Sequence, residues 1–328
     1  MLPGVSIIIP AYNAEKTIAE CLRAVQNLDW DGDREVILVN DGSEDNTAQI
    51  ASAFPQVRVI NTPNGGAPRA TNVGIKAARY DVVVSVDSDA MLEKEWLRKI
   101  MPWFKDTSVA AVGGHAVTGN KHLLGRIAGY YSEMQRARCS TYIDILGTVS
   151  TAYRRQALIQ IGMFDEQMKI AYDVDISRRL KAAGYQLVLE KSATCKHFWR
   201  DDLKSYCRQQ YGFAYYRLEL TRKFKRAHDQ ISGLGMILQV PFTALVILAA
   251  VSGSFLTPLV LLVLVLLPLV HMGESAAILS KKKDLAAALA LPFLFTLRNF
   301  AWMYAATIWG LRRVFSQIFA LFYMVRRL

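Results

Sequence analysis

The sequence predicts an α/β domain followed by an α-helical membrane region, and two contrasts along the 328 residues support this division. Up to about residue 230, short Val- and Ile-rich strands alternate with amphipathic helices, which is the pattern of βαβ units around a parallel sheet. Uncharged apolar runs long enough to cross a bilayer begin only after that point. We therefore expect a globular domain over residues 1–200, amphipathic interface helices over 201–230 and membrane helices over 231–328.

The strands and helices of the globular domain can be placed from apolar periodicity and punctuating residues. Asn13 is predicted to cap the first helix, and Pro68 suits the first turn of the third. The predicted strands are 5–10, 35–40, 57–61, 82–86, 109–114, 145–153 and 185–190. The predicted helices are 14–28, 46–54, 68–79, 93–104, 123–138, 154–161, 173–183 and 203–226.

Two of the predicted strands end in acidic residues. Asp41 follows the second strand, and Asp87 and Asp89 follow the Val-rich strand 82–86. Because the carboxyl ends of parallel strands meet at one edge of a sheet, these acids should lie close together. If the strand continued, Asp87 and Asp89 would share a face, and their oxygens suit Mg²⁺ or Mn²⁺. The pattern predicts a site for a divalent cation or a nucleotide; a solvated turn is the alternative.

The net charge of +11 comes partly from basic clusters that flank apolar segments. Because no nucleic-acid motif accompanies them, we expect anionic lipid at a cytoplasmic membrane face as the partner, and not nucleic acid. The chain begins almost directly with a strand and has no signal peptide, so we expect the globular part in the cytoplasm. The four cysteines lack the spacing of a metal finger or disulfide framework, which predicts free thiols: Cys21, Cys139, Cys195 and Cys207.

The C-terminal region predicts a multi-pass membrane protein. Leu234–Ser252 and Phe255–Met272 are uncharged runs that form a predicted hairpin, and Lys281–Lys283 marks the return to the cytoplasm. Leu285–Leu311 is long and apolar, but whether it crosses the bilayer or lies along the inner face stays open. It carries Arg298, which we expect to face protein or lipid headgroups because a buried charge is costly.

Several motifs occur in an order that resembles the family 2 glycosyltransferases, over about residues 5–215. Ser6–Asn13 resembles the family's opening strand and nucleotide-side loop, and Val39–Ser43 resembles its second motif. Asn64–Gly74 is similar to its Gly-rich Arg-Asn segment, and Asp87-Ser88-Asp89 matches its metal motif. The resemblance implies a GT-A (Rossmann-like) nucleotide-sugar domain.

The same resemblance implies roles on the donor side. Asp41 would contact base or ribose, and Arg69 would balance the charge of the diphosphate. Asp89 would hold the metal, and His197 resembles a histidine that assists it in some relatives, although a structural histidine is the alternative. Asp87 would point toward ribose or sugar. The nucleotide-binding residues implied are Pro10, Tyr12, Asn13, Asp41, Arg69, Asp87 and Ser88.

On the acceptor side, Tyr172–Asp175 lies where the family usually shows Glu-Asp-x-Asp, so Asp173 matches the catalytic base. An ordinary acid at a helix N-terminus is the alternative. Arg208–Phe213 resembles the Gln-x-x-Arg-Trp motif of processive synthases, but Gly212 and Phe213 replace its Arg and Trp, which disfavours polymerisation. The acceptor-side residues implied are Gly147, Thr148, Tyr172, Gln209 and Gln210.

The implied reaction is a metal-dependent displacement, with inversion, that moves a hexose from a nucleotide sugar to a lipid-linked acceptor. A polyprenyl or dolichyl phosphate, or a glycan built on one, would be that acceptor at the cytoplasmic membrane face. The family resemblance favours mannose from GDP-mannose. Three other readings stay open: a processive polysaccharide synthase, a membrane nucleotidyltransferase that releases pyrophosphate, and a non-catalytic membrane scaffold.

Overall fold

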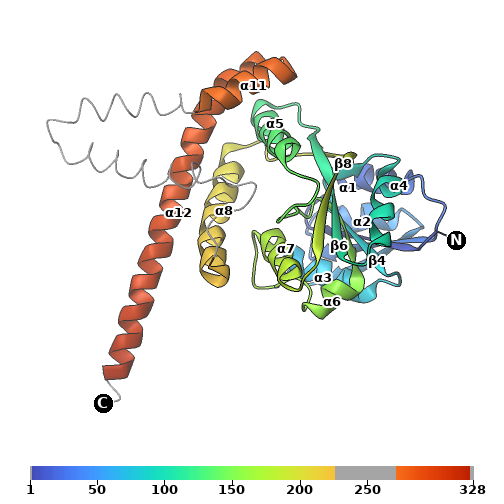
Figure 1. Ribbon diagram of the computed structural model, residues 1–328, viewed down its shortest axis with the longest axis horizontal. Helices are drawn as coiled ribbons and strands as arrows, with labels where there is room; N and C mark the ends of the chain where they lie inside the picture. The colour runs from blue at the N-terminus through green and yellow to red at the C-terminus, as the bar shows by residue number, and fades with distance from the viewer. Residues whose placement is uncertain (1, 226–270, 326–328) are drawn as a thin grey trace. The chain divides into compact units, whose positions relative to one another are not determined.

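The computed structural model describes residues 2–225 and 271–325 (Figure 1). The predicted hairpin of Leu234–Ser252 and Phe255–Met272 therefore lies outside the described residues, apart from its last two positions. The described chain divides into two compact units, one up to Trp199 and one from Arg200 onward.

The first unit is built on one eight-stranded sheet of order β3-β2-β1-β4-β7-β6-β8-β5. The predicted parallel sheet is confirmed for β1 to β4, but β7 runs antiparallel to both of its neighbours. β8 runs parallel to β6, and the short β5 runs antiparallel to β8. The strands are β1 Val5–Ala11, β2 Arg34–Asp41, β3 Val57–Thr62, β4 Val82–Val86, β5 Ala90–Leu92, β6 Val109–Thr118, β7 Ser150–Arg154 and β8 Gln186–His197.

Helices cover both faces of this sheet, and the alternation of strand side chains creates two cores. On β1, Ile7 and Ile9 belong to the core that α1, α2 and α4 cover, whereas Ile8 belongs to the core under α3, α6 and α7. Gly74 allows α3 to approach closely, since a Cβ there would lie 2.3 Å from Ile8. The helices are α1 Ile18–Gln26, α2 Thr47–Ser52, α3 Ala67–Ala77, α4 Trp96–Ile100 with a 3₁₀ turn Met101–Lys105, α5 Leu123–Arg138, α6 Arg155–Gln160 and α7 Tyr172–Ala182.

The prediction that Asn13 caps the first helix is wrong. Its backbone is left-handed, with φ at 48°, and α1 begins only at Ile18. Asn13 instead joins two loops: its N–H donates to Ser43 Oγ at 3.0 Å, and its side-chain oxygen accepts from the N–H of Glu44 at 2.9 Å. The loops after β1 and β2 are therefore tied together at the carboxyl edge of the sheet.

Strand directions explain why this edge gathers residues from distant parts of the chain. β4 ends here, and because β7 is antiparallel to it, Val86 lies opposite Ser150, the first residue of β7. β8 continues seven residues past the predicted end at Glu190 and reaches the same edge at His197. There, His197 lies opposite Ala90 of β5, a strand too short for the sequence pattern to reveal.

The second unit contains α8 Leu203–Phe224, α11 Met272–Lys282 and α12 Leu285–Val325. α8 and α12 lie side by side (Figure 1), joined by hydrogen bonds from the indole N–H of Trp302 to Gln210 and of Trp309 to Glu219. Among the described residues, one helical stretch is long and apolar enough to cross a membrane, Leu285–Arg313.

The buried position of Arg298 agrees with the expectation that its charge faces protein or headgroups. Its side chain is 4% exposed, and its guanidinium carbon lies 4.1 Å from the ring centre of Phe295 and 4.8 Å from that of Trp302. Aromatic faces attract a cation, so these contacts offset part of the cost of burial. Both aromatic rings belong to α12.

Candidate active site

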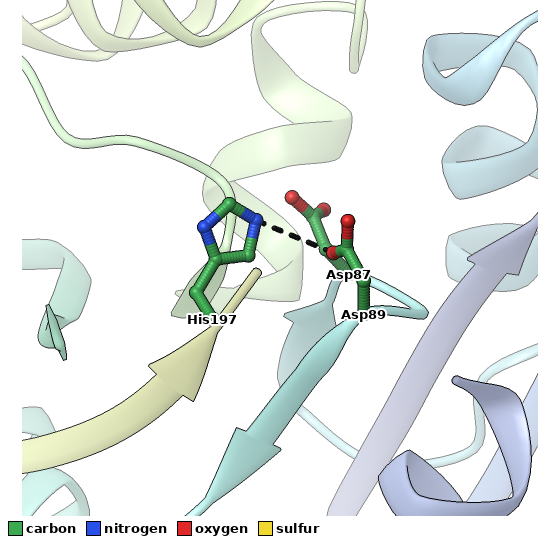
Figure 2. Close-up of side chains that lie close together, drawn as sticks. All are labelled: Asp87, Asp89 and His197. Atoms are coloured by element: carbon green, nitrogen blue, oxygen red, sulfur yellow. Dashed lines mark ion pairs between the residues drawn. The ribbon is translucent and has the colours of Figure 1, made fainter. Parts of the chain in front are cut away.

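Two carboxylates and one imidazole meet at the carboxyl edge of the sheet. Figure 2 shows Asp87, Asp89 and His197 turned toward one another, with one ligand atom of each within 4.8 Å of the others. His197 Nε2 lies 3.3 Å from Asp89 Oδ1. The contact follows from the strand pairing that sets Ala90 opposite His197. Asp87 is positioned by a tight turn, in which the Ala90 N–H donates to the Asp87 carbonyl at 2.9 Å.

These side chains fit a hard divalent cation. Two carboxylates with an imidazole are ligands that Mg²⁺ and especially Mn²⁺ accept. Asp89 is 34% exposed, so a substrate can reach a cation held there. The thiols of Cys21 and Cys195 lie beneath, and burial raises the pKa of both, that of Cys195 to about 12. They stay protonated near neutral pH, so they add no thiolate that would favour a soft metal.

Asp41 organises the loop that precedes α3. Its carboxylate is 2% exposed and accepts the N–H of Gly65 at 2.9 Å and of Gly66 at 2.8 Å. The side-chain amide of Asn64 donates to the Asp41 carbonyl at 3.0 Å. The structure therefore gives Asp41 a supporting role in this loop. Its predicted contact with base or ribose stays a prediction.

The other residues predicted to bind the nucleotide lie near the end of β1, in the first turn of α3 and on the loops that follow β1 and β4. Arg69 folds over the Gly-rich loop, with Nη1 2.8 Å from where a Cβ on Gly65 would be. Tyr12, after β1, is 50% exposed. Pro10 and Ser88 are half-buried, Asn13 is exposed, and Ser88 lies in the turn between the two acids. An exposed ring and a guanidinium along one edge suit a base and a diphosphate.

Asp173 lies in the first turn of α7 and faces the loop before β7. Its Oδ2 is 3.9 Å from the position of a Cβ on Gly147. The neighbouring Tyr172 is buried and hydrogen-bonded to Thr148; burial and then the charge of Asp87 raise the pKa of its hydroxyl. The role of Asp173 as the catalytic base stays a prediction.

One candidate functional residue was not predicted from the sequence. Arg136, near the end of α5, places Nη2 2.6 Å from where a Cβ on Gly147 would lie. No motif marks this arginine, because its contact depends on the fold and not on neighbouring residues. Gln209 and Gln210, predicted on the acceptor side, belong to α8 in the second unit, where Gln210 accepts a hydrogen bond from Trp302.

Comparison with known proteins relates part of the chain to a known family. Residues 6–162 match the description of Glycosyl transferase family 2. Among curated relatives, a poly-β-1,6-N-acetyl-D-glucosamine synthase of Staphylococcus aureus (strain COL) is 31% identical over 206 residues, covering 59% of this chain and 50% of the relative. The corresponding synthase of Staphylococcus epidermidis is 30% identical over 204 residues, covering 58% and 49%. The chain spans about half the length of these relatives.

Solved structures show the same fold at lower identity. A mannosyltransferase from Pyrobaculum calidifontis, in complex with GDP-Man and Mn²⁺, has a TM-score of 0.63 at 20% identity, covering 94% of this chain and 87% of that one. TarS 1-349 of S. aureus, in complex with UDP-GlcNAc, has a TM-score of 0.50 at 22% identity, covering 67% of each. Residues 6–162 therefore form a glycosyl transferase family 2 domain, and the first unit has the GT-A fold.

Proposed function

We propose that this protein is an inverting, metal-dependent glycosyltransferase that moves a hexose from a nucleotide sugar to a lipid-linked acceptor at a cytoplasmic membrane face. One observation carries the proposal: Asp87, Asp89 and His197 cluster at the carboxyl edge of the sheet, and Asp173 faces Gly147, shortly before the strand that begins at this edge. A cation ligand set beside a separate carboxylate provides one place for a diphosphate and another for a base.

In the proposed reaction, the acceptor oxygen forms a bond to the anomeric carbon as the bond from that carbon to the donor phosphate breaks. A single displacement of this kind inverts the anomeric centre. Asp173 takes the acceptor's proton, and the nucleoside diphosphate departs with the bonding pair. A divalent cation on Asp87, Asp89 and His197 would supply positive charge to the departing diphosphate. Arg69, above the Gly-rich loop, would add a second positive charge.

The second unit supports a membrane-bound acceptor. Exposed apolar residues on α12 recur at intervals of four and seven, so they form one apolar stripe. Lys281–Lys283 and Arg312-Arg313 flank the apolar stretch and suit anionic headgroups. The stripe consists of Leu285, Leu289, Phe293, Leu297, Tyr304, Leu311 and Phe315.

GDP-mannose is the donor we propose to test first, and UDP-GlcNAc is the alternative. The first follows the GDP-Man complex of the structurally similar mannosyltransferase. The second follows the N-acetylglucosamine polymer named for the curated relatives and the UDP-GlcNAc complex of TarS.

Processive polysaccharide synthesis is the second candidate function, because the curated relatives are synthases of a polymer. Against it, Gly212 and Phe213 stand where the processive motif has Arg and Trp. Product length separates the two functions. A product one sugar longer than its acceptor supports single transfer, and a ladder of lengths supports the synthase.

The deciding experiment uses the full chain in membranes, with radiolabelled GDP-mannose or UDP-GlcNAc, a polyprenyl phosphate and Mn²⁺. We expect label in the lipid extract with one donor, and loss of that label when the cation is chelated. A soluble sugar labelled as fast as the lipid-linked acceptor would refute the lipid assignment. No label from either donor in any acceptor would refute the proposed transfer.

A further inference from the structure

Two contacts fix the helix that carries Arg136. Gly129 of α5 approaches the end of β6 so closely that a Cβ there would lie 2.4 Å from the Cβ of Thr118. One turn later, the buried carboxylate of Glu133 accepts the Thr118 N–H at 2.7 Å. Positions 129, 133 and 136 share one helix face. Arg136 therefore lies on the anchored side of α5.

The guanidinium of Arg136 fills the space that a side chain at position 147 would occupy. Nη2 lies 2.6 Å from the site of a Cβ on Gly147, and Asp173 Oδ2 lies 3.9 Å from the same point. The absence of a side chain on Gly147 thus lets an arginine from a distant helix reach the neighbourhood of the proposed base.

Arg136 is a half-buried residue, yet its guanidinium forms no ion pair with a carboxylate in the described part of the chain. By contrast, Arg179 on α7 pairs with the buried Asp175 at 2.6 Å. A partly desolvated cation without a fixed anion is costly unless a ligand supplies one. The planar guanidinium offers paired donors that match the oxygens of a phosphate.

The charges at this edge also call for a second cation beside a phosphate. Asp87, Asp89 and Asp173 together carry three formal negative charges, of which a divalent cation would balance two. A bound phosphate adds more negative charge to the same region. Arg69 lies over the Gly-rich loop, whereas Arg136 lies beside Asp173. The two arginines therefore serve different parts of the site.

We propose that Arg136 binds a phosphate group of a substrate beside Asp173. This inference rests on the proposed function, because it assumes that substrates carrying phosphate enter this edge. Two sources share that chemistry: the diphosphate of the donor, and the phosphate that joins an acceptor to its lipid.

The test compares Arg136→Gln with Arg138→Gln in the full chain. Arg138 is exposed two positions further along α5, so its replacement removes the same charge away from the anchored face. Two quantities are measured: the affinity for GDP or UDP with Mn²⁺ by calorimetry, and KM for a polyprenyl phosphate in the transfer assay. Loss of a charged hydrogen bond predicts, for Arg136→Gln, about a tenfold or larger fall in nucleotide affinity or an equally large rise in KM for the polyprenyl phosphate. Which of the two quantities changes identifies the source of the phosphate.

Gly147→Ala provides a second route to the same result, because the added methyl group would displace the guanidinium while the charge is kept. We expect it to change the same quantity as Arg136→Gln and in the same direction, with an unchanged thermal midpoint for both variants. Unchanged nucleotide affinity together with unchanged KM in Arg136→Gln would overturn the proposal. If the wild-type protein transfers nothing, the proposed function fails, and the nucleotide affinity alone decides the role of Arg136.

Discussion

The two halves of the sheet deliver side chains to the candidate active site in different ways. In the parallel half, β1 to β4, each residue of interest follows its own strand within a short motif, as Asp41 follows β2 and Asp87 follows β4. In the mixed half, Gly147 precedes an antiparallel strand, and His197 ends a strand paired with the short β5. The parallel half thus supplies its site residues through local motifs, and the mixed half supplies them through long-range strand pairing.

The largest expected effect tests the mixed half. Asp173→Asn should reduce transfer about 10²- to 10⁴-fold, because an amide cannot accept the acceptor's proton. Nucleotide binding should persist, since the proposed nucleotide contacts lie mainly in the parallel half. Transfer rates and calorimetry with a nucleotide and Mn²⁺ measure the two properties. Asp81→Asn, an exposed position before β4, is the matched control. Full turnover by Asp173→Asn would remove its assignment as the base.

Asp89→Ala tests the turn after β4, the strand at which the two halves of the sheet meet. We expect a somewhat smaller effect than that of Asp173→Asn. Removing one of three ligands should weaken Mn²⁺-dependent nucleotide binding by about tenfold or more, since a charge-assisted interaction is lost. Titration of a nucleoside diphosphate at several Mn²⁺ concentrations measures this change. An unchanged titration would mean that the cation, if it binds, does not use this carboxylate.

His197→Ala should have a weaker effect than Asp89→Ala, because a neutral imidazole contributes less charge to a cation than a carboxylate does. We expect a several-fold rise in the Mn²⁺ concentration that gives half-maximal transfer, with the rate restored at high Mn²⁺. The ring also packs against Trp199 with centroids 4.6 Å apart. A lower thermal midpoint with an unchanged Mn²⁺ requirement would make His197 structural.

The smallest effect on the chemistry should come from Asp41→Asn. Its carboxylate accepts two backbone N–H groups, and an amide can satisfy only one of them, so we expect about 1.5–3 kcal/mol of lost stability. Chemical denaturation measures this change. Unchanged stability with weaker nucleotide binding would instead support the predicted contact with base or ribose.

The sequence predicts those features well that depend only on a single motif or on the regular spacing of apolar residues. Strand Val82–Val86 and helix Leu123–Arg138 have the predicted bounds, and the carboxylates of Asp87 and Asp89 lie at the predicted edge. The buried face of α1 is also as predicted, because its apolar residues recur at helical spacing: Ile18, Cys21, Leu22 and Val25.

The remaining features depend on contacts that no local pattern contains. The antiparallel direction of β7 follows from which strands it joins, and β5 is too short to show a period. The misplaced cap at Asn13 has a different cause: its side chain bonds to a second loop, and its left-handed backbone ends the strand before any helix starts. Arg136 reaches the site only because the residue opposite it, Gly147, has no side chain.

His197 is synthesised long after Asp87 and Asp89, and this order has a consequence for folding during biosynthesis. On a ribosome, Asp87 and Asp89 emerge long before the imidazole, and β5 has no strand partner until β8 is made. A nascent chain that ends before residue 186 would hold two carboxylates but not the third ligand. Tight cation binding should therefore begin only after this last strand has joined the sheet. Cation binding would then indicate that the domain has finished folding.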